Sequence, residues 1–348
     1  MLDLTSTNKE ANLENCAINK NNNNSSDDES SSSVSLSVLA SNLSGTDEIT
    51  IRIVMGKKVA KGSVVPDGPS LVTAVTLGDT NTNERRYSVY CALLKPDWLK
   101  GGESAEKGFL VCYASSCSQE LELFQNELDA HSKTLIVLLD ANLSGLATTV
   151  TTCLESWYSQ SVRYINRAAQ LMRPGLPAFL QAVLVGARIE LKEIEEKHEK
   201  DLRQFIDACR IPLLEKPDAE TDRTQRIWLS GGDGGITVDG DLDPTTFFCQ
   251  HWASILLNSA TIDTPVAIRN VIEEFKLKLI QDVNGIKRLV QQAVEDYYAL
   301  FKVLTFLKHS GYASVLLRVL KEENIHNKGD GATLVIDVLE EFSVAKLT

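Results

Sequence analysis

The residues in this sequence that most suggest ligand chemistry lie at positions 231–243, which read GGDGGITVDGDLD. A phosphate-binding P-loop follows its glycines with a lysine, and no lysine follows these glycines. A calcium loop needs glycine at its sixth position and glutamate at its twelfth. Counted from Asp239, those positions hold Pro244 and Gln250. We therefore predict a short β-hairpin or loop near 226–240, with neither a cofactor nor a metal bound to it.

The cysteines and histidines add no catalytic or metal-binding pattern. The seven cysteines are scattered without a C-x-x-C pair, which favours reduced thiols in a cytosolic protein. No histidine has another histidine or a cysteine three or four residues further on, and no H-E-x-x-H or G-x-S-x-G motif occurs. His251, beside Trp252 on an apolar helix, is predicted to be packed rather than catalytic. These observations predict a protein that is not an enzyme.

The bulk composition is that of a globular protein with an acidic charge. The 348 residues are 43% hydrophobic and 24% charged, and the net charge is −12. Such a charge disfavours nonspecific binding to nucleic acid, which depends on Lys and Arg. The N-terminus lacks the basic and apolar regions of a signal peptide, and the most apolar window, 175–191, is interrupted by Gln181 and Arg188. We expect peripheral contact with membranes, only through partners.

The N-terminal part divides into a tail and an α/β region. Residues 1–33 are rich in Asn and Ser and are predicted to form a disordered low-complexity tail. The α/β region spans 34–143. Its segment VSLSVL alternates like a strand, whereas ITIRIVMGKKVAKG fits a strand through Ile49, Ile51 and Ile53 or a helix through Ile51, Val54 or Met55, and Val59. Three strands are predicted in PSLVTAVTLGD, RRYSVYCALLK and KGFLVCYAS, and a helix follows in SCSQELELFQNELDAH.

The region 144–348 is predicted to be mainly helical. Residues 178–210 read as one long helix. A helix is predicted to begin with Asp243 as N-cap and Pro244 at the first position, and Thr264 and Pro265 repeat that device. The apolar stripe from 265 to 309 indicates one very long helix, or two that join near Asn284–Gly285. Gly311 is a predicted C-cap, and two shorter helices finish the chain.

One helical segment, AVEDYYALFKVLTFLK, is apolar on almost every face. A helix of this kind is either the buried central helix of a bundle or a helix with one face covered by a partner subunit. Upstream of it lies a basic cluster whose simplest role is a solvated face. The candidate partner-binding residues are Tyr297, Tyr298, Phe301, Lys276, Lys278, Lys287 and Arg288.

Several collinear segments resemble the Njmu-R family. The densest similarity lies in EEFKLKLIQDVNGIKRLVQQAVEDYYALFKVLTFLKHSG, and further matches are ELELFQNELD, ESWYSQSV, LRQFI, FCQHWASILLNSA and VIDVLEEF. The resemblance covers roughly residues 34–345. The Asn/Ser-rich leader and the stretch from Ile211 to Leu242 depart from the family pattern, so nothing carries over there.

The resemblance implies a non-enzymatic role. Family members form the small subunit of a complex with a large WD-repeat protein and a FAM-type scaffold protein. With a TBC-domain bridging protein, that complex helps golgins capture clathrin-adaptor vesicles in endosome-to-Golgi transport at the trans-Golgi network. A role in sperm development has also been proposed for the family. The expected location is the cytoplasm, peripheral at the trans-Golgi network and on cytoplasmic vesicles.

Together these observations predict an α+β protein. An N-terminal antiparallel β-meander with flanking helices, similar in element order to longin-type modules, precedes a mainly helical C-terminal bundle. The expected function is that of a vesicle-tethering subunit. The alternative is a small-GTPase effector or regulatory module in membrane traffic that uses the α/β region.

Overall fold

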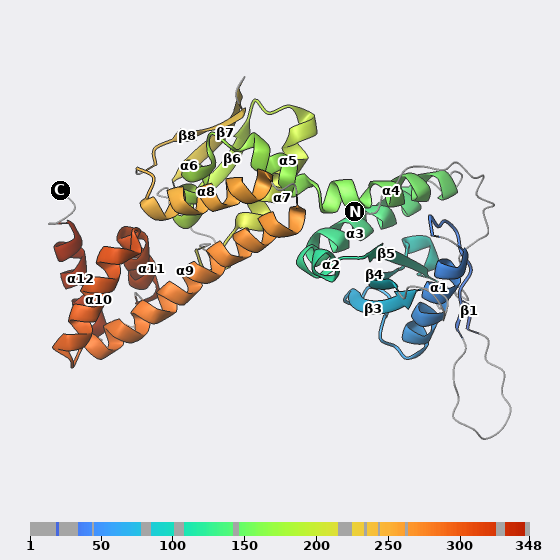
Figure 1. The fold of residues 1–348 in the computed structure, drawn as a ribbon, viewed down its shortest axis with the longest axis horizontal. Coiled ribbons are helices and arrows are strands. Elements are labelled where there is room, and N and C mark those ends of the chain that lie inside the picture. Colours follow the sequence, from blue (N-terminus) through green and yellow to red (C-terminus); the bar gives the residue numbers. More distant parts are fainter. Residues whose placement is uncertain are drawn as a thin grey trace. The chain divides into compact units, whose positions relative to one another are not determined.

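The computed structural model describes residues 19–20, 34–43, 45–77, 85–100, 108–141, 146–214, 225–232, 235–242, 244–261, 264–324 and 331–344. The chain divides into two compact units, residues 1–162 and 163–348 (Figure 1). The predicted tail, 1–33, lies outside the described residues, except for Asn19–Lys20. The helix over 146–161, which the sequence analysis places in the helical region, groups with the first unit.

The first unit contains the predicted antiparallel meander. Its strands are β3 (Leu71–Leu77), β4 (Arg85–Leu94) and β5 (Phe109–Ser115), in the order β3-β4-β5. A separate pair joins β1 (Asn19–Lys20) to β2 (Val34–Ser35). The strand expected from VSLSVL is therefore limited to two residues, and beyond it Leu36 and Leu39 pack into two different cores.

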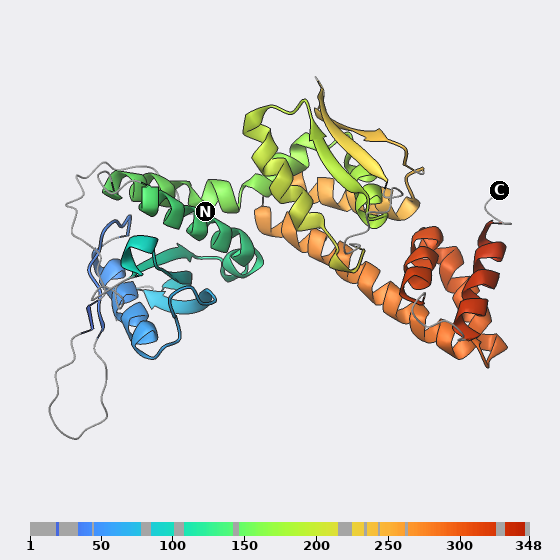
Figure 2. The same cartoon turned by 180° about the vertical axis from the view of Figure 1, so that it is seen from behind.

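The helices of this unit cover both faces of the β3-β4-β5 sheet (Figure 2). They are α1 (Gly45–Ala60), α2 (Ser118–Leu123), α3 (Gln125–Ala141) and α4 (Leu146–Ser161). Successive strand residues point to opposite faces. Cys91 accordingly lies in the core against α1, whereas Tyr90 lies in the core against α2, α3 and α4. A 3-10 turn, η1, spans Asp97–Leu99.

The ambiguous segment 49–62 forms helix α1 over most of its length. Ile51 and Met55 are buried one helical turn apart, as the helical interpretation predicts. Ile49 and Ile53, which a strand would have placed on the same face as Ile51, are 47% and 52% exposed. Ile51 and Met55 of α1 pack against apolar side chains on one face of the β3-β4-β5 sheet, so a helix with a single apolar stripe covers this face.

The second unit is mainly helical. Its helices are α5 (Tyr164–Leu171), α6 (Leu176–Leu184), α7 (Glu196–Cys209), α8 (Phe247–Thr261), α9 (Pro265–Ala293), α10 (Tyr297–Ser310), α11 (Ala313–Asn324) and α12 (Gly331–Val344). Its strands are β6 (Arg188–Lys192), β7 (Arg226–Gly232) and β8 (Gly235–Gly240), and a 3-10 turn, η4, spans Pro212–Leu214. The predicted α+β class is thus confirmed, with a meander first and helices after it.

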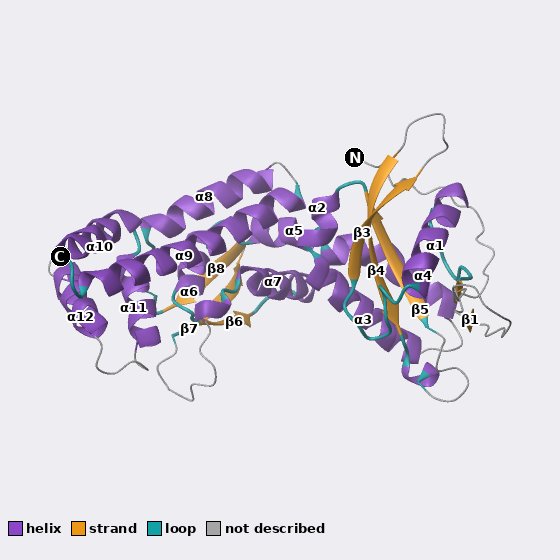
Figure 3. Ribbon diagram, turned by 90° about the horizontal axis from the view of Figure 1, so that it is seen from below, coloured by secondary structure: helices purple, strands orange, loops and turns teal. Residues whose placement is uncertain are grey.

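The prediction of one long helix over 178–210 is wrong. The chain leaves α6 at Gly186, whose φ of 64° lies in the left-handed region that glycine adopts readily. Residues 188–192 then form β6, which pairs in parallel with β7. The resulting sheet, in the order β6-β7-β8, stands out from the surrounding helices in Figure 3. Pairing with a strand distant in sequence therefore outweighs the helical pattern here.

The glycine-rich stretch forms the predicted hairpin of β7 and β8, with Gly232 paired with Gly235. Gly235 has a φ of 120°, and a Cβ atom there would lie 2.7 Å from the carbonyl oxygen of Leu171. The described glycines of this hairpin thus serve the backbone and its close packing. Asp243, the predicted N-cap, lies outside the described residues.

The Gly235→Ala substitution is expected to destabilise the second unit by about 2 kcal/mol or more, because it adds both a strained φ and a steric clash. Gly232→Ala is the matched control. Its Cβ would meet nothing closer than 3.7 Å, and its φ lies outside the left-handed range. Thermal melting of both variants tests the account, and equal melting temperatures would contradict it.

Helix α8 begins at Phe247 rather than at Pro244. The Thr246 carbonyl accepts a hydrogen bond from the Gln250 N–H at 3.1 Å, and its Oγ1 accepts one from the Cys249 N–H at 3.4 Å. Thr246 therefore caps the helix. Its hydroxyl also donates to the side-chain oxygen of Gln181 on α6, at 2.9 Å. This tertiary contact favours a start three residues later than the sequence predicts.

Helix α9 is the long helix against which other helices of the second unit pack. It runs unbroken through Asn284–Gly285, and α10 to α12 pack near its C-terminal end (Figure 1). The chain breaks instead at residues 294–296, between α9 and α10. The predicted C-cap is confirmed, since Gly311 ends α10 with a φ of 77°.

Candidate interaction surface

The three aromatic candidates lie together at the start of α10 and point into solvent. Tyr297 is 90% exposed, and Tyr298 and Phe301 are each 64% exposed. Ala299, Val303 and Leu307 form the buried side of the same helix. The first interpretation of this segment, a central helix buried on all sides, is therefore wrong. We call Tyr297, Tyr298 and Phe301 the aromatic face.

Local hydrogen bonds hold the aromatic face in place. Asp296 caps α10, since its Oδ1 accepts a hydrogen bond from the Tyr298 N–H at 2.8 Å. One turn further on, the Thr305 hydroxyl donates to the Phe301 carbonyl at 2.9 Å. The break between α9 and α10 thus ends in a defined helix start, which orients the first turn of α10.

Exposed apolar side chains also occur just before α10 and on α12. Val294, in the link before α10, is 45% exposed. It packs closely on Gly331 at the start of α12, where a Cβ would lie 2.5 Å from a Val294 methyl carbon. Further along α12, Leu334 and Val338 are 71% and 40% exposed. Clusters of exposed aromatic and aliphatic residues are typical of protein-binding surfaces.

The charge on α10 differs from that of the whole chain. Its sequence, YYALFKVLTFLKHS, contains no Asp or Glu, although the chain has a net charge of −12. Lys302 and Lys308 are both exposed on it. The Lys302 ammonium lies 4.5 Å from the centre of the Tyr298 ring, which is within the range of a cation–π contact. The exposed side of α10 therefore combines aromatic rings with positive charge.

The structure does not gather the four basic candidates into one cluster. Lys276 and Lys278 lie two residues apart on α9, so they point in nearly opposite directions. The Lys276 amine lies 3.1 Å from Glu273, and its side chain is only 16% exposed. Lys287 is half-buried and Arg288 is exposed, about two turns further along the helix. Lys278 belongs to a network that the sequence analysis does not foresee.

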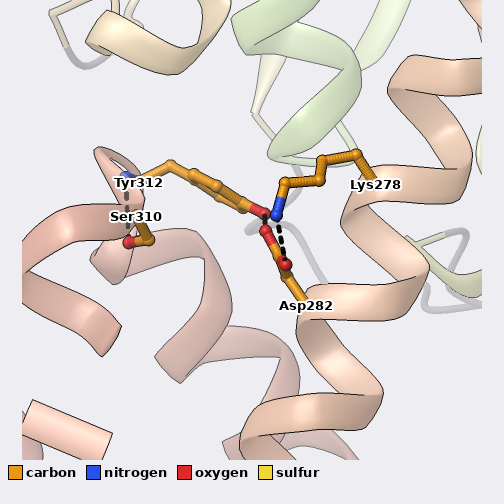
Figure 4. A network of polar contacts seen from close by, with 4 residues as sticks. All are labelled: Lys278, Asp282, Ser310 and Tyr312. Carbon is orange, nitrogen blue, oxygen red and sulfur yellow. Dashed lines mark hydrogen bonds and ion pairs between the residues drawn. The ribbon is translucent and has the colours of Figure 1, made fainter. Parts of the chain in front are cut away.

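That network joins α9 to the corner between α10 and α11 (Figure 4). The buried Asp282 carboxylate accepts a hydrogen bond from Lys278 at 2.6 Å and another from the Tyr312 hydroxyl at 2.5 Å. Burial raises the pKa of Tyr312 well above its usual value, and the hydrogen bond to Asp282 raises it further. Lys278 and Asp282 have the spacing of a helical ion pair, which is a usable signal, but nothing in the sequence points from Asp282 to Tyr312.

The similarity to known proteins extends over nearly the whole chain and is not limited to one motif. Residues 4–345 match the Njmu-R1-like protein family. The chain belongs to this family. Protein Njmu-R1 of Mus musculus is 30% identical in an alignment of 320 residues that covers 88% of this chain and 80% of the mouse protein. No solved structure matches, so the similarity to longin-type modules stays a prediction.

Among its described residues, this Njmu-R1-like protein shows no group of three or more His, Cys, Asp or Glu side chains that could hold a metal ion. None of the described helices is long and apolar enough to cross a membrane. His251, predicted to be packed rather than catalytic, stacks on the Phe247 ring but is exposed at the surface rather than buried. That no cofactor is needed stays a prediction.

The cysteines of this Njmu-R1-like protein are mostly buried, as far as they are described. Cys91, Cys153, Cys209 and Cys249 are buried, and all six described cysteines are free thiols. Burial raises the pKa of Cys91 and of Cys249 to about 11, and that of Cys209 to about 12. Thiols with such a pKa are rarely deprotonated at neutral pH and make poor nucleophiles.

Proposed function

We propose that this chain is a non-catalytic subunit of a complex that helps golgins capture endosome-derived clathrin-adaptor vesicles at the trans-Golgi network. Membership of the Njmu-R1-like family supports the proposal, because the family resemblance implies a subunit that binds a large WD-repeat protein and a FAM-type scaffold. The TBC-domain bridging protein is an indirect partner, which this chain reaches through the complex. The chain works in the cytoplasm and reaches the Golgi membrane and the vesicles through its partners.

The observation that carries the proposal is the aromatic face. Burying a side chain the size of phenylalanine contributes about 1.5–3 kcal/mol, and here the first turns of α10 leave three aromatic rings in water. Tyrosine is enriched among the residues that dominate binding energy at protein interfaces, and phenylalanine is enriched in the interfaces themselves. The rings are held on a capped helix, so little conformational freedom is lost when a partner covers them.

The double variant Tyr297→Ala/Phe301→Ala is expected to lose the two large subunits. Each substitution removes a ring that we place at the centre of the interface, and an effect of about 2 kcal/mol corresponds to roughly thirtyfold in affinity. The tagged full chain is purified from cells under gentle lysis, and co-purified subunits are quantified by mass spectrometry. Both side chains are exposed, so the melting temperature of the double variant should stay close to that of the wild type.

Trp98→Ala in the first unit is the matched control, since Trp98 is another partly exposed aromatic residue, 42% exposed on η1. It should retain both partners. Equal recovery from the double variant and the control would show that the aromatic face is not the docking surface. Recovery of neither large subunit with the wild-type chain would refute the proposed function itself.

A further inference from the structure

A strip along the exposed side of α10 leads from the aromatic face to a pocket. Tyr298, Lys302, Thr305 and His309 follow one another at intervals of four, three and four residues, so they line one side of the helix. All four are exposed. The last two also line the pocket, whose volume is about 340 Å³.

The pocket has apolar walls and a polar rim. Phe248 of α8, Phe306 of α10 and Tyr312 form its aromatic part, and the Phe248 and Tyr312 rings pack with their centroids 4.0 Å apart. Its volume is at the low end of the range for small-molecule sites, and its apolar walls suit one bulky side chain. We call this pocket, together with the strip that leads to it, the α10 docking site.

Positive charge dominates the rim of the α10 docking site. Lys302 lies on the strip, and the exposed Lys308 lies six residues further along α10, about 120° around the helix from Lys302. Asp282 is the one carboxylate among the pocket-lining residues, and its two oxygens already accept hydrogen bonds from Lys278 and Tyr312 (Figure 4). The Lys278 side chain is 48% exposed, so its ammonium can donate to a further acceptor.

We propose that the α10 docking site binds a short acidic segment of a protein partner that carries one bulky apolar side chain. The apolar side chain fills the pocket between Phe248, Phe306 and Tyr312, and carboxylates of the segment pair with Lys302 and Lys308. The aromatic face then packs against the remainder of the same partner. The inference rests on the proposed function for its claim that the partner is another subunit.

Selection of displayed random peptides on the immobilised full chain tests this inference. The enriched peptides are expected to share Asp or Glu residues and one Leu, Phe, Met or Trp. Binding of one fluorescein-labelled peptide from this pool is then followed by fluorescence polarisation, and it should weaken with added salt. Lys302→Glu/Lys308→Glu is expected to lower its affinity at least tenfold. Thr305→Trp, which adds bulk at the exposed rim of the pocket, should do the same.

The matched control is Lys61→Glu/Lys133→Glu, which makes an equal change of charge at two exposed lysines of the first unit. Equal peptide affinity for this control and the α10 variants would overturn the inference, as would selected peptides without acidic residues. Two further measurements exclude other occupants. Binding to vesicles of phosphatidylcholine and phosphatidylserine that depends on Lys302 and Lys308, without peptide binding, would mean a lipid surface. A dimer in analytical ultracentrifugation that the α10 variant abolishes would mean a second copy of the chain.

The same charge variant separates this inference from the proposed function. If Lys302→Glu/Lys308→Glu still recovers both large subunits while Tyr297→Ala/Phe301→Ala does not, the acidic segment is refuted and the proposed function stands. If the wild-type chain selects acidic peptides whose affinity depends on the α10 lysines but recovers no subunit from cells, the inference stands and the proposed function fails.

Discussion

Replacing Phe275 with alanine is expected to destabilise the core between α8 and α9 by about 3–5 kcal/mol, the usual effect of removing a buried phenylalanine ring. Phe275 is 2% exposed. Its ring centroid lies 5.7 Å from that of Phe248 and 6.0 Å from that of Trp252. Phe248 also packs on Tyr312, so the cavity would loosen the walls of the α10 docking site as well. We therefore expect this variant to lose both stability and partner binding.

The control for this prediction is Leu277→Ala, two residues away on the same helix. Leu277 is 51% exposed, so its truncation should change stability by no more than about 0.5 kcal/mol. Hydrogen exchange of peptides from α8 and α9 is the suitable measurement, because the two units of the chain need not unfold together. Equal protection in the two variants would show that Phe275 is not part of a tightly packed core.

Two kinds of effect on binding can then be told apart. Phe275→Ala should lower protection in α8 and α9 and weaken binding, whereas Tyr297→Ala/Phe301→Ala should weaken binding alone. The separation follows from the structure of α10, which buries Ala299, Val303 and Leu307 and leaves the aromatic face outside the core. Because the aromatic face contributes little to the stability of the free chain, its residues can be suited to binding a partner without loss of stability.

Local patterns predicted those elements whose partners are close in sequence. The meander was predicted correctly because β3, β4 and β5 are short segments rich in Val, Tyr and Phe, are separated by polar or Gly-containing turns, and follow one another along the chain. The helical stripe through Ile51 and Met55 was one of two interpretations, and the core against the sheet selects it. By contrast, β6 was missed because its partner β7 begins 38 residues after β6 begins, beyond the reach of any local pattern.

In the candidate site, too, local features could be predicted from the sequence and features that depend on tertiary contacts could not. Tyr297, Tyr298 and Phe301 lie within five residues, and their grouping on α10 could be predicted from helical spacing alone. Whether they are buried could not, because that depends on which side of α10 faces α9. The basic candidates were joined by proximity in sequence, yet Lys276 and Lys278 point to different sides of α9. Burial of the aromatic candidates and clustering of the basic candidates depend on tertiary contacts, which a local sequence pattern does not predict.

The hydrogen bonds of Asp282 are expected to contribute strongly to the stability of the second unit. Asp282→Ala is expected to destabilise the packing of α9 against the α10–α11 corner by about 2–4 kcal/mol. The Tyr312 hydroxyl is buried and would be left without its acceptor, which costs about 1–3 kcal/mol. The Asp282 side chain is itself 8% exposed, so a small cavity adds to this effect. Lys278 contributes little, because its half-exposed ammonium can turn to water.

Tyr312→Phe supplies the comparison, since it removes the hydroxyl, keeps the ring against Phe248 and leaves Asp282 paired with Lys278. It is expected to cost about 1 kcal/mol. In the Tyr312→Phe background, Asp282→Ala should then cost less than it does in the wild type, because no hydroxyl remains to be stranded. The three variants are compared by hydrogen exchange of peptides from α9 and α11. Strictly additive effects would show that the hydroxyl and the carboxylate do not stabilise each other, and the link between α9 and the corner that shapes the pocket would have to lie in apolar packing instead.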